Sequence, residues 1–163
     1  MKTIKVKKGQ ILQRKGDLNT NVYVVESGLL RSYSIDEKGK EHIYLFGPEK
    51  WIVGDAASQD QPCELFIDAL EDSVLVVRGN NIEAIEHEEF DRFETMQIIR
   101  NRFSVLQNRI IMLMSSTAIE RYEHFIETYP GIVQRVPQRM IASYLGITPE
   151  ALSKAKGDRL KKR

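Results

Sequence analysis

The pattern of apolar and polar positions divides the chain into a first half of short strands and a second half of helices. Between Thr3 and Arg78, alternating apolar and polar residues form short runs that are separated by turns. The segment "DEKGKE" is typical of a hairpin turn, with Gly39 placed for positive φ. About eight strands, with turn signals roughly every 8–12 residues, favour an antiparallel barrel or sandwich over alternating strand and helix units.

From about Asn80 the apolar spacing becomes helical. The segment "NNIEAIEHEEF" predicts a short helix with Asn80 or Asn81 as its N-cap. A long helix is expected from about Phe90 to Ser115, because its apolar residues alternate three and four apart and form a heptad seam. The seam residues are Met96, Ile99, Phe103, Leu106, Ile110 and Leu113.

A second apolar stripe lies on the same long helix, at Ile98, Val105 and Met112. With two apolar faces, one can pack on the body of its own chain while the other meets a second copy. We therefore expect a homodimer through this helix. The alternative is a single amphipathic helix buried within its own chain.

The segment "TAIERYEHFIETYPG" predicts a further helix, which Pro130-Gly131 ends, and "IVQRVP" predicts an extended connector. A two-helix unit follows. Gly146 can end its first helix in a left-handed conformation, and Thr148 can cap the second helix with Pro149 at its first position. The small and apolar residues that a helix-turn-helix requires are Ile141, Ala142, Leu145, Gly146, Ile147, Leu152 and Ala155. An ordinary helical hairpin is the alternative, and Gly157 is expected to end the second helix early.

Charge separates this unit from the rest of the chain. Residues 1–88 carry 11 Lys and Arg against 15 Asp and Glu, whereas residues 135–163 carry 8 against 2, although the whole chain has a net charge of only +1. A basic end on an acidic body indicates contact with a polyanion, and a disordered solubilising tail is the alternative.

In a helix-turn-helix, the second helix lies in the major groove of double-stranded DNA with its N-terminal residues on base edges. The residues expected there are Thr148, Pro149, Glu150, Ser153 and Lys154. Glu150 can accept from a cytosine amino group, while Ser153 and Lys154 can donate to a base or a phosphate. The residues expected to hold phosphates are Gln138, Arg139, Lys156, Arg159 and Lys161 to Arg163.

Composition argues against several other classes of protein. No apolar run approaches the roughly 18 residues of a membrane span, and the N-terminus lacks the apolar core of a secretory signal, so we expect a cytoplasmic protein without a membrane partner. The single cysteine, Cys63, excludes a disulfide framework, a cysteine-rich zinc site and an iron–sulfur cluster. Of three histidines only His42 lies among the strands, so no metal site is expected. No constellation of nucleophile, base and acid indicates an enzyme. Cys63 is interpreted as a packing residue, with a redox sensor as the alternative.

The order of strand-rich body, long seam helix and terminal two-helix unit resembles the Crp/Fnr superfamily of bacterial transcription regulators, and most closely its Bacteroidetes-type members. The segments that carry the resemblance are "KKGQILQRKGD", "VYVVESGLLRSY", "LEDSVLVV", "ERYEHFIETYP" and "VPQRMIASYLGITPEALSK". It implies an α+β fold with an antiparallel, jelly-roll-like β-roll sensor of the cyclic-nucleotide-binding kind in residues 1–88. A dimerisation helix in 89–116 and a helix-turn-helix domain without a full wing in 117–163 would follow. Promoter DNA is the implied partner, and RNA polymerase is a candidate one.

Three departures from the family pattern alter the expected function. Cyclic-nucleotide-binding members have Gly-Glu at the start of a phosphate cassette and an Arg followed by Ser or Thr further on. Here Gly54-Asp55 resembles the opening, but Cys63 and Glu64 stand where the Arg pair would fall. Since a carboxylate repels a phosphate, we predict that the chain does not bind cyclic AMP tightly, and its effector is unknown. The other departures are the short segment before Lys7 and the ending "GDRLKKR", which suggest a reduced support for the β-roll and a shallow salt dependence of DNA binding.

Two functions remain open from the sequence. The first is a transcription regulator that binds promoter DNA as a homodimer, with a degenerate sensor domain. The second is a dimeric sensor or interaction protein that no longer binds DNA. The sequence does not identify the operator, or whether the protein activates or represses.

Overall fold

The computed structural model describes residues 2–18, 21–57, 60–79 and 92–161. The chain divides into two compact units, Met1–Glu88 and Glu89–Arg163. The short helix predicted in "NNIEAIEHEEF", with its cap at Asn80 or Asn81, lies outside the described residues. The further division of the second unit near residue 116 stays a prediction.

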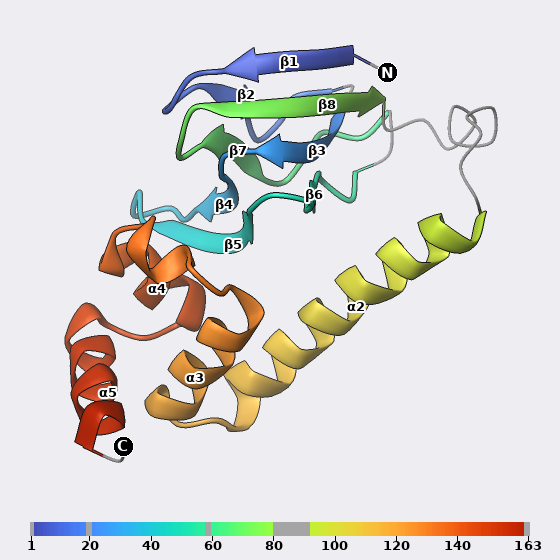
Figure 1. Ribbon diagram of the computed structural model, residues 1–163. Coiled ribbons are helices and arrows are strands. Elements are labelled where there is room, and N and C mark those ends of the chain that lie inside the picture. The colour runs from blue at the N-terminus through green and yellow to red at the C-terminus, as the bar shows by residue number, and fades with distance from the viewer. Residues whose placement is uncertain (1, 19–20, 58–59, 80–91, 162–163) are drawn as a thin grey trace. The chain divides into compact units, whose positions relative to one another are not determined.

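The first unit is built from two antiparallel four-stranded sheets, with strand orders β1-β8-β3-β6 and β2-β7-β4-β5 (Figure 1). The strands are β1 (Lys2–Val6), β2 (Ile11–Gln13), β3 (Asn21–Ser27), β4 (Leu30–Ile35), β5 (Glu41–Gly47), β6 (Ile52–Val53), β7 (Phe66–Ala69) and β8 (Ser73–Gly79). The predicted antiparallel β-roll is therefore confirmed, and of the barrel and sandwich that the pattern left open it has two sheets. The turn at "DEKGKE" joins β4 to β5, and Gly39 in it has φ 77°.

The core of this unit lies between the two sheets. One sheet contributes Tyr23, Val25 and Leu75, and the other contributes Leu30, Leu45 and Ile67, all at most 3% exposed. Trp51, the only tryptophan of the chain, packs partly buried against this cluster. Each fully buried aliphatic side chain contributes about 1.5–3 kcal/mol to the stability of the fold. Because alternate residues of a strand point to the same face, the apolar positions of both sheets meet in this core.

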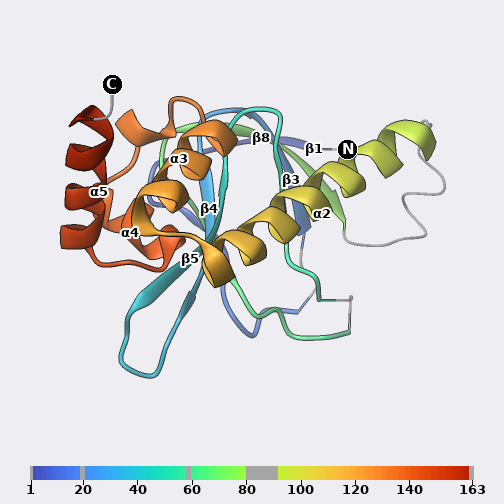
Figure 2. The ribbon, with the colours of Figure 1, turned by 90° about the horizontal axis from the view of Figure 1, so that it is seen from below.

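In its described part, the second unit consists of α2 (Arg92–Ser115), α3 (Ala118–Thr128), the 3₁₀ turn η1 (Ile132–Gln134), α4 (Gln138–Leu145) and α5 (Pro149–Lys161). The long helix α2 leads directly into the shorter helices (Figure 2). Thr117 and Glu120 form a capping box at the start of α3, which satisfies two orphan backbone donors. Three aromatic side chains, Phe125, Tyr129 and Tyr144, lie with ring centroids 5.3–5.5 Å apart at the centre of this unit.

Two local predictions in the second unit are wrong. The connector "IVQRVP" is not extended throughout, because Gly131 at φ 86° starts the 3₁₀ turn η1, which buries Ile132. Gly157 does not end the last helix, since α5 continues through it to Lys161. A glycine inside a helix costs only about 1 kcal/mol relative to alanine, and here its neighbours Lys156 and Arg159 are good helix formers.

Candidate nucleic-acid interface and sensor site

The turn between α4 and α5 depends on Gly146. This residue adopts φ 64° and ψ 32°, and its N–H and that of Ile147 donate to carbonyls in the last turn of α4. A Cβ at position 146 would lie 3.3 Å from Leu113 Cδ2, which is tighter than ordinary packing. Both the left-handed backbone, which the sequence predicted, and the close approach of α2, which it did not, favour glycine here.

Thr148 caps α5, and Pro149 is its first residue. The Thr148 hydroxyl accepts the backbone N–H of Ala151 at 3.2 Å. Leu152 and Ala155 are buried against the rest of the unit. The short turn and the two buried residues give α5 one fixed face toward the core and one face toward solvent.

The five residues predicted to meet base edges, Thr148, Pro149, Glu150, Ser153 and Lys154, are all exposed. Hydrogen bonds from its own backbone N–H and from Thr148 hold the pKa of Glu150 below its ordinary value, so this side chain presents a charged acceptor. Of the residues predicted to hold phosphates, Gln138 and Arg139 are exposed, whereas Lys156 and Arg159 are half-buried; positions 162 and 163 lie outside the described residues. Lys161, at the end of α5, is also exposed. The structure thus places the five predicted base-edge residues on exposed positions of one segment, but only part of the predicted phosphate-binding set.

The long helix α2 exposes a narrow apolar stripe. Met96, Phe103 and Ile110 repeat every seven residues and are 65%, 66% and 58% exposed, and Met114 extends the stripe at 81%. On the opposite side Met112 is buried, at 3%. We call Met96, Phe103, Ile110 and Met114 the α2 stripe.

The other predicted seam residues lie differently. Leu106 and Leu113 are half-buried, and Leu113 lies against the turn at Gly146. The side chain of Ile99 lies outside the described residues. The sequence reading missed Met114, although its position four residues after Ile110 places it on the same helical face.

In the β-roll, the side chain of Asp55 fills the place that the sequence assigned to a phosphate cassette. Its Oδ2 accepts the backbone N–H groups of Glu64 and Leu65 at 3.1 and 2.9 Å, and Oδ1 accepts that of Ala57 at 2.9 Å. Gln13 Nε2 donates to the carbonyl of Leu65 at 2.8 Å and approaches Asp55 Oδ2 at 3.4 Å. Sequence reasoning missed Gln13, whose buried position on β2 becomes informative only when β7 is paired beside it.

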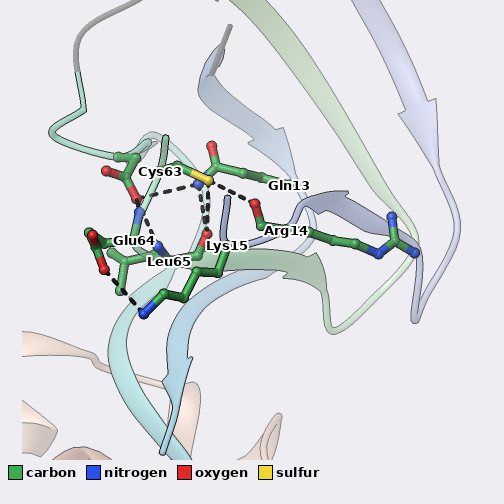
Figure 3. Close-up of polar contacts among 7 residues, drawn as sticks. Gln13, Arg14, Lys15, Cys63, Glu64 and Leu65 are labelled. Carbon is green, nitrogen blue, oxygen red and sulfur yellow. Dashed lines mark hydrogen bonds and ion pairs between the residues drawn. The ribbon is translucent and has the colours of Figure 1, made fainter. Parts of the chain in front are cut away.

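The neighbouring side chains also make their polar contacts within the β-roll (Figure 3). The Cys63 thiol is buried and donates to the Arg14 carbonyl at 2.7 Å, and burial raises its pKa. Glu64 pairs with Lys15 at 3.3 Å on the surface. In this arrangement a carboxylate, that of Asp55, accepts the backbone N–H groups of Glu64 and Leu65.

A buried ion pair on β4 and β7 was not predicted. Arg31 donates to both oxygens of Asp68 at 2.8 and 2.9 Å, with the two side chains 8% and 10% exposed. Arg31 also donates to Glu41 and lies 4.0 Å from the ring centroid of Tyr33. Burial alone would lower the pKa of Arg31, but the hydrogen bonds to both carboxylates raise it above its ordinary value. The Arg31 guanidinium makes four hydrogen bonds to two carboxylates of the β-roll, which indicates a structural role.

Two absences concern only the described part of the chain. Within residues 2–18, 21–57, 60–79 and 92–161, no cluster of three or more His, Cys, Asp or Glu side chains could hold a metal ion. No helix in the same residues is long and apolar enough to cross a membrane.

Comparison with known proteins places the two units together in one family. Residues 3–82 match the cyclic nucleotide-binding domain. The chain is 28% identical to the regulatory protein HlyX of Actinobacillus pleuropneumoniae and 30% identical to the fumarate and nitrate reduction regulatory protein of Vibrio cholerae, in each case over 93% of its own length. It spans 69% and 66% of the lengths of these two relatives.

The fold is also shared with solved structures. FixK2 from Bradyrhizobium japonicum superposes with a TM-score of 0.80 at 19% identity, over 99% of this chain and 85% of that one. The transcriptional regulator TTHA1359 of the CRP/FNR family, from Thermus thermophilus, superposes with a TM-score of 0.68 at 17% identity, over 99% and 87%. With a match to the cyclic nucleotide-binding domain, similarity to regulatory proteins over 93% of its length and this shared fold, the chain belongs to the Crp/Fnr superfamily.

Proposed function

We propose that this protein is a transcription regulator that binds promoter DNA as a homodimer through α4 and α5. The observation that carries the proposal is the first turn of α5, where Thr148, Glu150 and Ser153 face solvent while Leu152 and Ala155 anchor the helix from behind. A helix held in this way can enter the major groove without losing its packing. Names of relatives such as "regulatory protein" and "fumarate and nitrate reduction regulatory protein" are consistent with it.

The contacts divide into two kinds. Thr148, Glu150 and Ser153 are exposed near the start of α5, so in a complex with DNA they would meet base edges and determine which sequence is bound. Arg139, Lys154 and Lys156 supply positive charge around them, and their contacts with phosphates would provide affinity with little sequence preference. The 13 residues of α5 are enough for the helix to cross the groove.

The α2 stripe supports the homodimer. Four large apolar side chains exposed along one face of a helix are costly in water, and a second copy would cover them by the same surface through two-fold symmetry. The repeat of seven residues suits a pair of helices that pack at a small crossing angle. A dimer would present two copies of α5, as the two half-sites of an operator require. Contact with RNA polymerase remains a prediction.

The β-roll is proposed not to bind cyclic AMP tightly. Asp55 accepts the backbone donors of Glu64 and Leu65, and displacing it would place two negative groups in one small space. The sensor domain of this protein would therefore respond to a different ligand or act without one.

DNA binding is tested by electrophoretic mobility shift with the full chain and a pool of random duplex DNA at low salt. Wild type is expected to shift the pool. Lys154→Glu is expected to weaken binding about 10-fold or more, because it replaces a phosphate contact by a like charge. The matched control is Lys5→Glu, which makes the same charge change at an exposed residue of β1 and should bind as wild type. If wild type gives no shift at low salt, the protein is instead a dimeric sensor or interaction protein.

A further inference from the structure

We propose that two arginines, Arg109 and Arg121, rigidly couple the α2 stripe to the DNA-reading helix and thereby set the spacing of the two α5 helices in the dimer. The inference rests on the proposed function and adds a positioning role to residues outside the α2 stripe and outside the predicted DNA contacts. It is carried by the hydrogen bonds that these guanidinium groups make to three segments of the second unit.

Arg121, in the first turn of α3, joins three pieces of backbone. Its Nε donates to the Ser116 carbonyl, its Nη1 to that of Leu145 and its Nη2 to that of Leu113, each at 3.0 Å. Leu113 lies in the last turn of α2 and Leu145 is the last residue of α4. One planar side chain thus connects the ends of two helices with the link between α2 and α3.

Arg109 makes a second connection from α2 itself. Its Nη2 donates to the Tyr144 carbonyl at 3.1 Å, and its guanidinium carbon lies 4.1 Å from the centroid of the Tyr144 ring. Tyr144 is in turn packed among Phe125 and Tyr129. The carbonyls at the end of a helix carry partial negative charge, so two cations at the end of α4 stabilise it as well as position it.

The two arginines act immediately before the turn at Gly146. Leu113 and Arg121 both lie close to Gly146, where a Cβ would be 3.3 and 3.6 Å from them. Pro149, the first residue of α5, follows three positions later. Any rotation of α2 in the dimer would therefore be passed to α5 through hydrogen bonds and packing.

The consequence concerns both copies of the helix. A helix-turn-helix dimer binds half-sites about 34–36 Å apart, so a small change in angle at α4 becomes a large displacement between two α5 helices. Removing the hydrogen bonds of either guanidinium should broaden the distribution of distances between the two α5 helices. Each α5 should still be able to bind a single half-site. This distinguishes positioning from a direct contact with DNA.

The first experiment measures the distance between the helices without DNA. A nitroxide on Ser153→Cys, which is exposed on α5, reports the distance between the two copies by double electron–electron resonance; buried Cys63 should take up no label in unmodified wild type. Arg121→Gln and Arg109→Gln are expected to broaden the distance distribution, and Arg121→Lys, which keeps the charge but not the planar fork, should lie between. Arg14→Gln makes the same change at an exposed side chain of the β-roll. Its distance distribution should match that of the labelled Ser153→Cys protein in which all arginines are kept. Equal widths for Arg121→Gln and its parent would overturn the proposal, and so would a labelled protein that is monomeric.

The second experiment uses DNA selected from a random pool by the wild-type chain, as a full operator and as a duplex with one half-site. Arg121→Gln is expected to lose about 10-fold in affinity for the full operator and little affinity for the half-site. A loss of about 10-fold is the size of a typical coupling between two sites. An equal loss on both would mean a merely structural role and would overturn the inference. If the wild-type chain selects no DNA from the pool, the proposed function is contradicted, while the distance measurement still decides the coupling.

Discussion

The two units of this protein differ in how their polar side chains are used. In the β-roll, the polar side chains at the expected ligand position hydrogen-bond to backbone groups of the same unit. Asp55 accepts the N–H groups of Glu64 and Leu65, and the buried Cys63 thiol donates to the Arg14 carbonyl. In the helical unit, Thr148, Glu150 and Ser153 face solvent. A side chain whose hydrogen bonds are already made within its own unit has little to offer a ligand, whereas an exposed one on a rigid helix is available.

This difference determines which polar groups each unit can offer to a ligand. The match to the cyclic nucleotide-binding domain covers residues 3–82, and within this range Asp55 accepts the backbone N–H groups of Glu64 and Leu65. The exposed candidate groups belong to the unit that follows. The function must therefore be argued from the side chains of each unit separately.

The prediction with the largest expected effect tests whether the exposed α2 stripe of the helical unit forms the dimer interface. Phe103→Asp places a charge at the centre of the α2 stripe, and symmetry introduces it twice in a dimer. Because the charge would have to be desolvated without a partner, we expect dimerisation to weaken by about 100-fold or more, and light scattering to report half the mass of wild type.

The matched control for this variant is Asn108→Asp. Residue 108 is also exposed on α2 but lies away from the α2 stripe, so the same acidic group should leave the mass unchanged. A dimer of unchanged mass with Phe103→Asp would remove the α2 stripe from the interface.

What the sequence predicted well is determined by local chemistry. Gly146 and Thr148 were identified because a left-handed glycine followed by a capping hydroxyl has few alternatives between two helices. The strands and the apolar stripe followed from periods of two and seven residues, which depend only on which face is buried.

The misses depend on partners distant in sequence. Arg31 pairs with Asp68, 37 residues away, and Arg121 donates to Leu145, 24 residues away. A charged residue looks the same in a sequence whether it is solvated or buried, and only the pairing of β4 with β7 brings the first pair together. Asp55 was placed in the cassette by resemblance, but its role as an internal acceptor required the positions of the Glu64 and Leu65 amides.

The next prediction tests whether the buried ion pair of the β-roll contributes to its stability. Asp68→Asn keeps the size of the side chain but leaves the buried Arg31 cation without its bidentate partner. We expect the free energy of unfolding to fall by about 3 kcal/mol, measured by urea denaturation with the fluorescence of Trp51 as the reporter of this unit.

Lys7→Met is the control for that measurement. It breaks the ion pair between Lys7 and Asp72, whose side chains are 85% and 61% exposed, and should not change the unfolding curve measurably. A similar curve for Asp68→Asn and Lys7→Met would show that the buried pair contributes no more than a surface one.

The smallest expected effect addresses Asp55 directly. Asp55→Ala removes the acceptor of the Ala57, Glu64 and Leu65 N–H groups, so the free energy of unfolding should fall by about 1–3 kcal/mol, whereas Asp60→Ala, at an exposed position of the same loop, should behave as wild type. Isothermal titration with cyclic AMP should show no tight binding to either variant or to wild type, because removing one carboxylate does not supply the missing guanidinium. Micromolar or tighter binding by wild type would mean that the carboxylate leaves these amides readily, and the contrast between a closed β-roll and an exposed α5 would then no longer hold.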